Sequence, residues 1–166
     1  MNLRRHLMKL FQVATLLALA TLPSVQGIAG PAPTRFGSNG QDLKAINALL
    51  ANYTRAVSDR DQALFESLLL DRSIPFSGVP ATGKTGSDRE TRNYESFRKG
   101  VFEGEPFTQK FRDVHIEQDG ALANVTLVFE NTQPAGKSWG WKILQLLKVD
   151  GDWKIASEYY TAHPAK

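Results

Sequence analysis

The sequence predicts an α+β fold, with helices in the first half of the chain and antiparallel strands in the second. Two observations carry this prediction. Apolar residues step by three and four along one stripe of an amphipathic helix, at Leu43, Ile46, Leu50, Tyr53 and Val57. From residue 107 onward the periodicity changes to two, and Asp150-Gly151 is a strong signal for a two-residue hairpin turn.

Two further helices and one short strand are predicted before residue 107. Asp59 or Asp61 begins a second helix, whose apolar positions are Leu64, Phe65, Leu68 and Leu69. Residues 73–77 form a short strand, and Pro75 favours an edge position for it. A third helical stripe consists of Tyr94, Phe97 and Val101.

The remaining chain is predicted as four strands, at residues 107–117, 121–130, 138–149 and 152–161. The second of these alternates most clearly, with one apolar face made of Ala121, Ala123, Val125, Leu127 and Phe129. We therefore expect the helices to lie over one face of an antiparallel sheet.

The N-terminal residues have the pattern of an export signal. A basic segment ends at Lys9, and 13 mostly apolar residues, Leu10–Leu22, follow it. This stretch is shorter than the ~20 residues that a membrane-spanning helix needs. We predict a signal peptide at residues 1–27, a flexible lead-in at 28–40 and one domain at 41–163. The mature protein is expected to be periplasmic or extracellular, without a stable membrane anchor.

Composition excludes several classes of function. The 166 residues contain no cysteine, which rules out disulfides, thiolate metal sites and a cysteine nucleophile. The formal charge is +3, but residues 1–27 hold three bases and no acid, so the remaining chain has 17 basic and 17 acidic residues. A balanced charge does not favour a nucleic-acid partner. We also predict no cofactor and no metal.

Two local patterns resemble known sites but have simpler explanations. Residues 78–85, GVPATGKT, match the phosphate-binding P-loop pattern. The polar residues that follow cannot form the buried helix that such a loop requires, so we interpret the match as coincidental. Asp113, His115 and Glu117 share one face of a strand, but they alternate with apolar residues as in a half-exposed strand.

The order of elements resembles the nuclear transport factor 2-like superfamily, in its polyketide cyclase-like and lumazine-binding-like branch. Residues 46–65, INALLANYTRAVSDRDQALF, are similar to the first two helices of that superfamily, and residues 146–160, LLKVDGDWKIASEYY, to its last hairpin. The resemblance implies a cone-shaped fold, in which three N-terminal helices pack on a strongly curved, mostly antiparallel sheet. The superfamily includes enzymes and binding proteins, so the fold alone does not decide the activity.

The resemblance also places individual residues in the cone. In ketosteroid isomerase, a member of the superfamily, a tyrosine and two aspartates form the site. The tyrosine corresponds to Tyr53, whereas the aspartates correspond to Ser77 and Gln145. Neither replacement can accept a proton near neutral pH, so this isomerase reaction is not expected and no catalytic residue is assigned.

The hairpin turn adds three residues to the predicted pocket. If Asp150-Gly151 is the turn, continuous pairing puts Trp141, Glu158 and Tyr160 on the face of Gln145. The predicted ligand-binding residues are thus Tyr53, Ser77, Trp141, Gln145, Glu158 and Tyr160. Both faces of this hairpin are apolar, which also predicts a homodimer through the outer face.

Three functions remain compatible with this pocket. The favoured one is a non-catalytic domain that binds a small hydrophobic or aromatic molecule. The alternative is an isomerase, dehydratase or cyclase in which Glu158 is the general base and Tyr53 polarises a carbonyl. A buried Glu158 hydrogen-bonded to Tyr53 or Ser77 would favour the enzyme. A pure dimerisation domain, the third, would have no cavity.

Overall fold

The computed structural model describes residues 36–82 and 93–163. The predicted signal peptide, most of the predicted lead-in, and Lys84 and Thr85 of the P-loop-like pattern lie outside these residues. No helix within the described ranges is long and apolar enough to cross a membrane.

Three helices precede most of the sheet, as predicted. Helix α1 (Gly40–Asp59) buries the predicted apolar stripe, including Ile46, Leu50, Tyr53 and Val57. Helix α2 (Gln62–Leu68) begins at Asp61, whose side chain accepts a hydrogen bond from the backbone N–H of Leu64. Helix α3 (Tyr94–Arg98) continues into a π-helical turn, η1 (Lys99–Glu103).

The five strands form one sheet in the order β1-β5-β4-β3-β2. Strand β1 (Phe76–Pro80) lies at the edge and pairs in parallel with β5 (Asp152–Ala162). The other neighbours, β2 (Thr108–Asp119), β3 (Leu122–Gln133) and β4 (Gly136–Val149), pair antiparallel. Asp150 and Gly151 both have positive φ, as the predicted hairpin turn between β4 and β5 requires.

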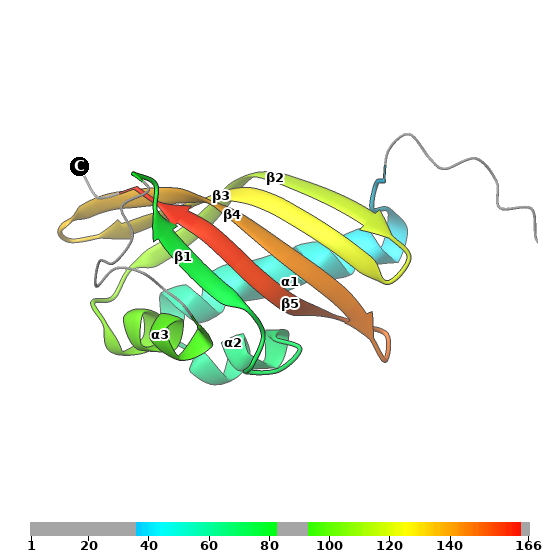
Figure 1. The fold of residues 1–166 in the computed structure, drawn as a ribbon, viewed down its shortest axis with the longest axis horizontal. Coiled ribbons are helices and arrows are strands. Elements are labelled where there is room, and N and C mark those ends of the chain that lie inside the picture. The colour runs from blue at the N-terminus through cyan, green and yellow to red at the C-terminus, as the bar shows by residue number, and fades with distance from the viewer. Residues whose placement is uncertain (1–35, 83–92, 164–166) are drawn as a thin grey trace, which may run out of the picture. The chain divides into compact units, whose positions relative to one another are not determined.

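The predicted α+β fold is confirmed, with the helices packed against a curved, mostly antiparallel sheet (Figure 1). Figure 1 shows α1 running along the sheet, with α2 and α3 near the start of β1. The strand boundaries differ from the prediction by up to three residues, most in two strands. The first strand begins at Phe76 rather than Ser73, and β3 extends to Gln133 instead of ending at Glu130.

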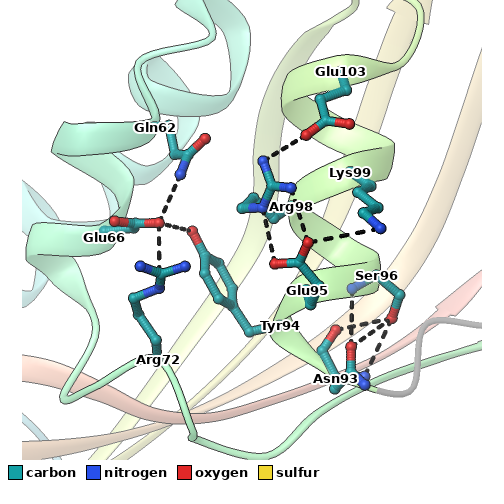
Figure 2. A network of polar contacts seen from close by, with 10 residues as sticks. All are labelled: Gln62, Glu66, Arg72, Asn93, Tyr94, Glu95, Ser96, Arg98, Lys99 and Glu103. Carbon is teal, nitrogen blue, oxygen red and sulfur yellow. Dashed lines mark hydrogen bonds and ion pairs between the residues drawn. The ribbon is translucent and has the colours of Figure 1, made fainter.

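A polar network connects α2 to α3 (Figure 2). Glu66 of α2 accepts hydrogen bonds from the side chains of Gln62 and Tyr94, both at 2.8 Å, and pairs with Arg72 at 3.6 Å. The Tyr94 ring itself is buried and stacks on Phe65. This network therefore attaches α3 to the helix before it, while the rings beneath it extend the core.

The first glycine of the P-loop-like pattern has a packing role. Gly78 lies in β1 next to Tyr160 of β5. A Cβ at Gly78 would lie 2.2 Å from Cζ of Tyr160, so any side chain would displace the ring. Close packing of a tyrosine thus explains this glycine without a phosphate ligand.

Candidate functional site

Three polar side chains meet in the interior between α1 and the sheet. Tyr53 comes from α1, Lys142 from β4 and Glu158 from β5, and all three are at most 2% exposed. The Lys142 ammonium lies 2.6 Å from Oε1 of Glu158 and donates to the Tyr53 hydroxyl at 2.5 Å. The hydroxyl donates in turn to the Glu158 carboxylate, at 2.9 Å from Oε1 and 2.8 Å from Oε2. We call these residues the interior trio.

A β-bulge in β5 brings Glu158 to this face of the sheet. Near the turn, Leu146 pairs with Ile155 as the uninterrupted register predicts, but Gln145 pairs with Ser157. Ala156 is thus the extra residue on β5. Beyond it the partners are Leu144 with Glu158 and Lys142 with Tyr160. The bulge therefore puts Glu158 and Tyr160 on the same face as Lys142 and Leu144.

Burial opposes charge on each member of the interior trio. Loss of solvation raises the pKa of Glu158, and the ion pair with Lys142 acts in the opposite direction. Loss of solvation lowers the pKa of Lys142, again opposed by Glu158. Desolvation and the neighbouring Glu158 raise the pKa of Tyr53, so this hydroxyl keeps its proton. Lys142 and Glu158 together bring no net charge into the core.

Aromatic rings surround the Lys142 ammonium. Its Nζ lies 4.4 Å from the ring centre of Tyr53 and 5.3 Å from those of Phe129 and Tyr160. Phe111 and Phe97 follow at 5.7 Å and 5.8 Å. The negative faces of aromatic rings attract a cation, which favours the ammonium form at this position.

A cavity of about 170 Å³ opens beside Lys142. Its apolar wall consists of Phe97, Val101, Phe107, Phe129 and Tyr160, and Gly100 lies on the same side as Val101. Its polar lining consists of Lys142, Gln109 and Asn131. Lys142 contacts both Tyr53 and Glu158, but these two residues do not line the cavity.

Gly140 makes room for one wall of this cavity. A Cβ there would lie 1.8 Å from the carbonyl oxygen of Thr161 and 2.7 Å from the Phe129 ring. Phe129 and Gly140 are paired across β3 and β4. The glycine between Trp139 and Trp141 therefore lets the Phe129 ring lie over the strand.

The structure brings together only half of the predicted pocket residues. Tyr53 and Glu158 are buried in the interior trio, and Tyr160 lines the cavity. The predicted position of Trp141 and Gln145 on that face is wrong. Trp141 is 48% exposed, and Gln145 accepts a hydrogen bond from Ser157 on the opposite face. Both errors follow from the resemblance, which placed Gln145 inside, because Trp141 lies on the same face of β4 as Gln145.

Ser77 also lies on the opposite face. Its neighbours Phe76 and Gly78 are buried toward the helices, whereas Ser77 is beside the exposed Tyr159. The prediction placed Ser77 inside because the resemblance matched it to one of the two site aspartates of ketosteroid isomerase. The role of the six residues in binding a ligand stays a prediction.

Sequence analysis missed three polar residues of the cavity. The prediction placed Trp141, and therefore not its neighbour Lys142, on the inner face, and it did not include Gln109 or Asn131. The one sequence signal for a buried Lys142 is that apolar residues flank it on both sides. Lys148 has apolar neighbours too, so this signal does not distinguish the two lysines. Among the described residues, no group of three or more metal-ligating side chains is present. His115 and Glu117 are 71% and 50% exposed, as expected of a solvated strand face.

The fold and the interior site define a cone-fold domain of the nuclear transport factor 2-like type. A family model for the SnoaL-like domain matches residues 46–160, and the chain belongs to this family. No curated protein shows significant similarity to the chain.

Several solved structures share the fold. A nuclear transport factor 2-like protein of unknown function from Shewanella baltica OS155 is 20% identical, with a TM-score of 0.58 over 75% of this chain and 96% of that one. A similar protein from Pseudomonas putida KT2440 is 12% identical, with a TM-score of 0.59 over 75% and 89%. A putative scytalone dehydratase from Novosphingobium aromaticivorans DSM 12444 is 14% identical, with a TM-score of 0.57 over 76% and 87%. At these identities the similarity shows the fold alone.

Proposed function

We propose that this domain binds a small, uncharged aromatic compound through a carbonyl oxygen, without transforming it. The observation that carries the proposal is the cavity beside Lys142. An ammonium group has three N–H donors. Two of them are directed to Tyr53 and Glu158, which leaves a third, and Lys142 lines the cavity. A ligand oxygen at this point would complete the hydrogen bonding of Lys142.

The size of the cavity limits the ligand to about one ring. Drug-sized pockets occupy roughly 300–1,000 Å³, whereas an apolar cavity of about 150 Å³ holds benzene. The cavity here measures about 170 Å³. Its aromatic walls suit a ring, because stacked and edge-on contacts add to the burial of apolar surface. A pure dimerisation domain is expected to have a filled interior, so the open volume does not favour that function.

Titration calorimetry with acetophenone tests the proposal. Gly100 lines the cavity and is exposed, and a Cβ there would meet no atom within 4 Å, so Gly100→Leu adds an apolar side chain to the lining without a clash at its Cβ. Gly37 also has open space around it but does not line the cavity, which makes Gly37→Leu the matched control. We expect binding by the wild type and the control, and at least tenfold weaker binding by Gly100→Leu. Equal binding by all three proteins would contradict the proposal.

The second candidate is an isomerase, dehydratase or cyclase with Glu158 as general base. Glu158 is buried and hydrogen-bonded to Tyr53, which is the arrangement that favours the enzyme, and burial raises its pKa toward the range of a base at neutral pH. The putative scytalone dehydratase shares the fold. Against it, both carboxylate oxygens accept hydrogen bonds, and Glu158 is fully buried and does not line the cavity.

Proton exchange distinguishes the two candidates. Acetophenone has exchangeable methyl protons next to its carbonyl, so a general base would catalyse their replacement by deuterium in D₂O. We expect NMR to show no acceleration over buffer. Acceleration that Glu158→Gln abolishes would establish the enzyme instead.

We also propose that the domain acts after export, in the periplasm or outside the cell. The support is the basic segment and the apolar residues Leu10–Leu22 in the sequence. N-terminal sequencing of secreted protein should begin near Ile28 or Gly30. Intact Met1 in a soluble cytoplasmic fraction would contradict export. The homodimer through the outer sheet face, where Trp141 and Tyr159 are exposed, stays a prediction.

A further inference from the structure

The cavity contains a second polar feature, at some distance from Lys142. The side chain of Gln109 donates from Nε2 to Oδ1 of Asn131 at 2.8 Å. Its Oε1 atom is buried and has no hydrogen-bond partner, and it is the one buried side-chain atom of this kind among the described residues. The residue is 8% exposed and lines the cavity.

An unpaired acceptor in this position lowers the stability of the protein when no ligand is bound. A buried polar atom without a partner destabilises a fold, because it has lost its hydrogen bonds to water and gained none in return. Unsatisfied atoms of this kind are rare in folded proteins, and each calls for a cause. A ligand that donates a hydrogen bond from inside the cavity would remove the penalty.

The sheet register separates Gln109 from Lys142. Gln109 pairs with Asn131 on β3, and Lys142 pairs with Leu127 on the same strand. These partners are four residues apart, which is roughly 13 Å along a strand. Phe129 lies between them and its ring forms part of the wall. A one-ring ligand that reaches both groups therefore needs its two polar substituents at opposite ends.

The charge of the site selects the substituent that faces Lys142. The ammonium is already paired with Glu158 at 2.6 Å. A carboxylate ligand would add a second negative charge beside that glutamate in a poorly solvated interior, which is unfavourable. An uncharged carbonyl oxygen accepts the same hydrogen bond without this repulsion.

We infer that the preferred ligand class is an uncharged aromatic carbonyl compound with a hydroxyl group para to the carbonyl. The carbonyl oxygen accepts from Lys142, and the hydroxyl donates to Oε1 of Gln109. This inference rests on the proposed function and adds the substituent that distinguishes one aromatic ligand from another. Gln109 is then a specificity-determining residue, not a catalytic one.

The test compares 4-hydroxyacetophenone with three relatives by titration calorimetry on the wild-type protein. The relatives are acetophenone, which lacks the hydroxyl, 2-hydroxyacetophenone, which has it at the wrong position, and 4-hydroxybenzoate, which carries the negative charge. One buried hydrogen bond to an otherwise unpaired atom corresponds to about a tenfold difference in affinity. We expect 4-hydroxyacetophenone to bind at least tenfold more tightly than each relative.

A variant assigns the difference to Gln109. Gln109→Met keeps the length of the side chain and removes the acceptor, so acetophenone and 4-hydroxyacetophenone should bind with similar affinity. The wild-type series alone decides the inference if this variant does not fold. Equal affinity of the two ketones for the wild type, with Gly100→Leu still blocking both, would overturn the inference and leave the proposed function standing. No binding of any ketone would overturn both.

Discussion

The molecule contains the same kind of polar trio twice, and the two copies behave differently. Each consists of a glutamate that accepts a hydrogen bond from a tyrosine and pairs with a basic side chain. One is the interior trio, Tyr53, Glu158 and Lys142. The other joins α2 to α3 and consists of Tyr94, Glu66 and Arg72 (Figure 2); we call it the rim trio. Similar chemistry therefore lies in two different environments.

Solvent exposure accounts for the difference. Burial raises the pKa of Glu158, whereas the pKa of Glu66 is lowered, chiefly by the hydrogen bond from Gln62. The side chain of Lys142 is 2% exposed and that of Arg72 is 64% exposed. Water can replace a missing partner at the rim but not in the interior. The comparison shows how burial changes the energetic importance of the same kind of contacts. In the interior trio each group is needed to compensate a buried charge, whereas in the rim trio the ion pair contributes little to stability.

Removal of the interior cation should have the largest effect. Lys142→Met leaves the Glu158 carboxylate buried without a counter-charge, which should lower the free energy of unfolding at pH 7 by about 3–5 kcal/mol. Urea denaturation measures this loss. The double variant Lys142→Met with Glu158→Gln should recover much of it, since no buried charge then remains. A loss below about 1 kcal/mol in the single variant would show that the interior trio is solvated.

The pH dependence of Lys142→Met should identify the carboxylate as the cause. A carboxyl group whose folded-state pKa lies above its unfolded value of about 4.3 favours folding when it is protonated. Stability of the variant should therefore be highest below that value and fall as the pH rises through the raised pKa of Glu158. A loss independent of pH would point to packing instead.

The two tyrosine hydroxyls provide a matched comparison. Tyr53→Phe deprives both Lys142 and Glu158 of a hydrogen bond in the buried interior, which should cost about 1–3 kcal/mol. Tyr94→Phe removes one bond to the partly solvated Glu66 and should cost about 1 kcal/mol or less. Thermal unfolding of the two variants measures the difference. Equal losses would break the contrast between interior and rim.

Removal of the rim cation should have a small effect. Arg72→Met breaks an exposed ion pair with Glu66, and such pairs contribute about 0–1 kcal/mol. We expect a change within this range in urea denaturation, and a smaller one at high salt because screening weakens exposed pairs. A loss comparable to that of Lys142→Met would contradict the assignment of Arg72 to the solvated rim.

The smallest effect concerns the acid limb of the stability curve. Hydrogen bonds from Lys148, Gln118 and Trp153 lower the pKa of Asp42 to about 2. Because this pKa lies below the unfolded value of about 3.9, its contribution is present above that value and is lost as the pH falls toward 2. Asp42→Asn should flatten the decline between these limits, opposite in sign to Glu158. An unchanged acid limb would show that other carboxylates dominate it.

Much of the fold was predictable from local patterns in the sequence. The helical stripe that includes Tyr53 and the turn at Asp150-Gly151 each depend on residues close together in the chain. The N-cap at Asp61 is equally local. Periodicity and turn chemistry are properties of short segments, so a single sequence reveals them.

The positions of Glu158 and Tyr160 relative to β4 depended on one extra residue in β5, which no local sequence pattern indicated. Pairing from the turn was correct as far as Leu146 and Ile155, and the extra residue Ala156 then reversed which side chains of β5 face those of β4. Because side chains alternate across a strand, a shift of one residue exchanges the two faces. Trp141 was expected inside for a different reason, because it shares a face of β4 with Gln145, which the resemblance placed in the pocket; the structure has Lys142 there.

The sequence by itself determined the class of fold, the order of its elements and the position of Tyr53 on the buried face of α1. Only the tertiary structure decided which charges enter the core and where space remains. A lysine such as Lys142 is tolerated there because Glu158 and Tyr53 arrive from two other elements to complete its hydrogen bonds. The cavity depends on rings and a glycine from five separate segments, whose distances are set only when the sheet curves and the helices pack on it.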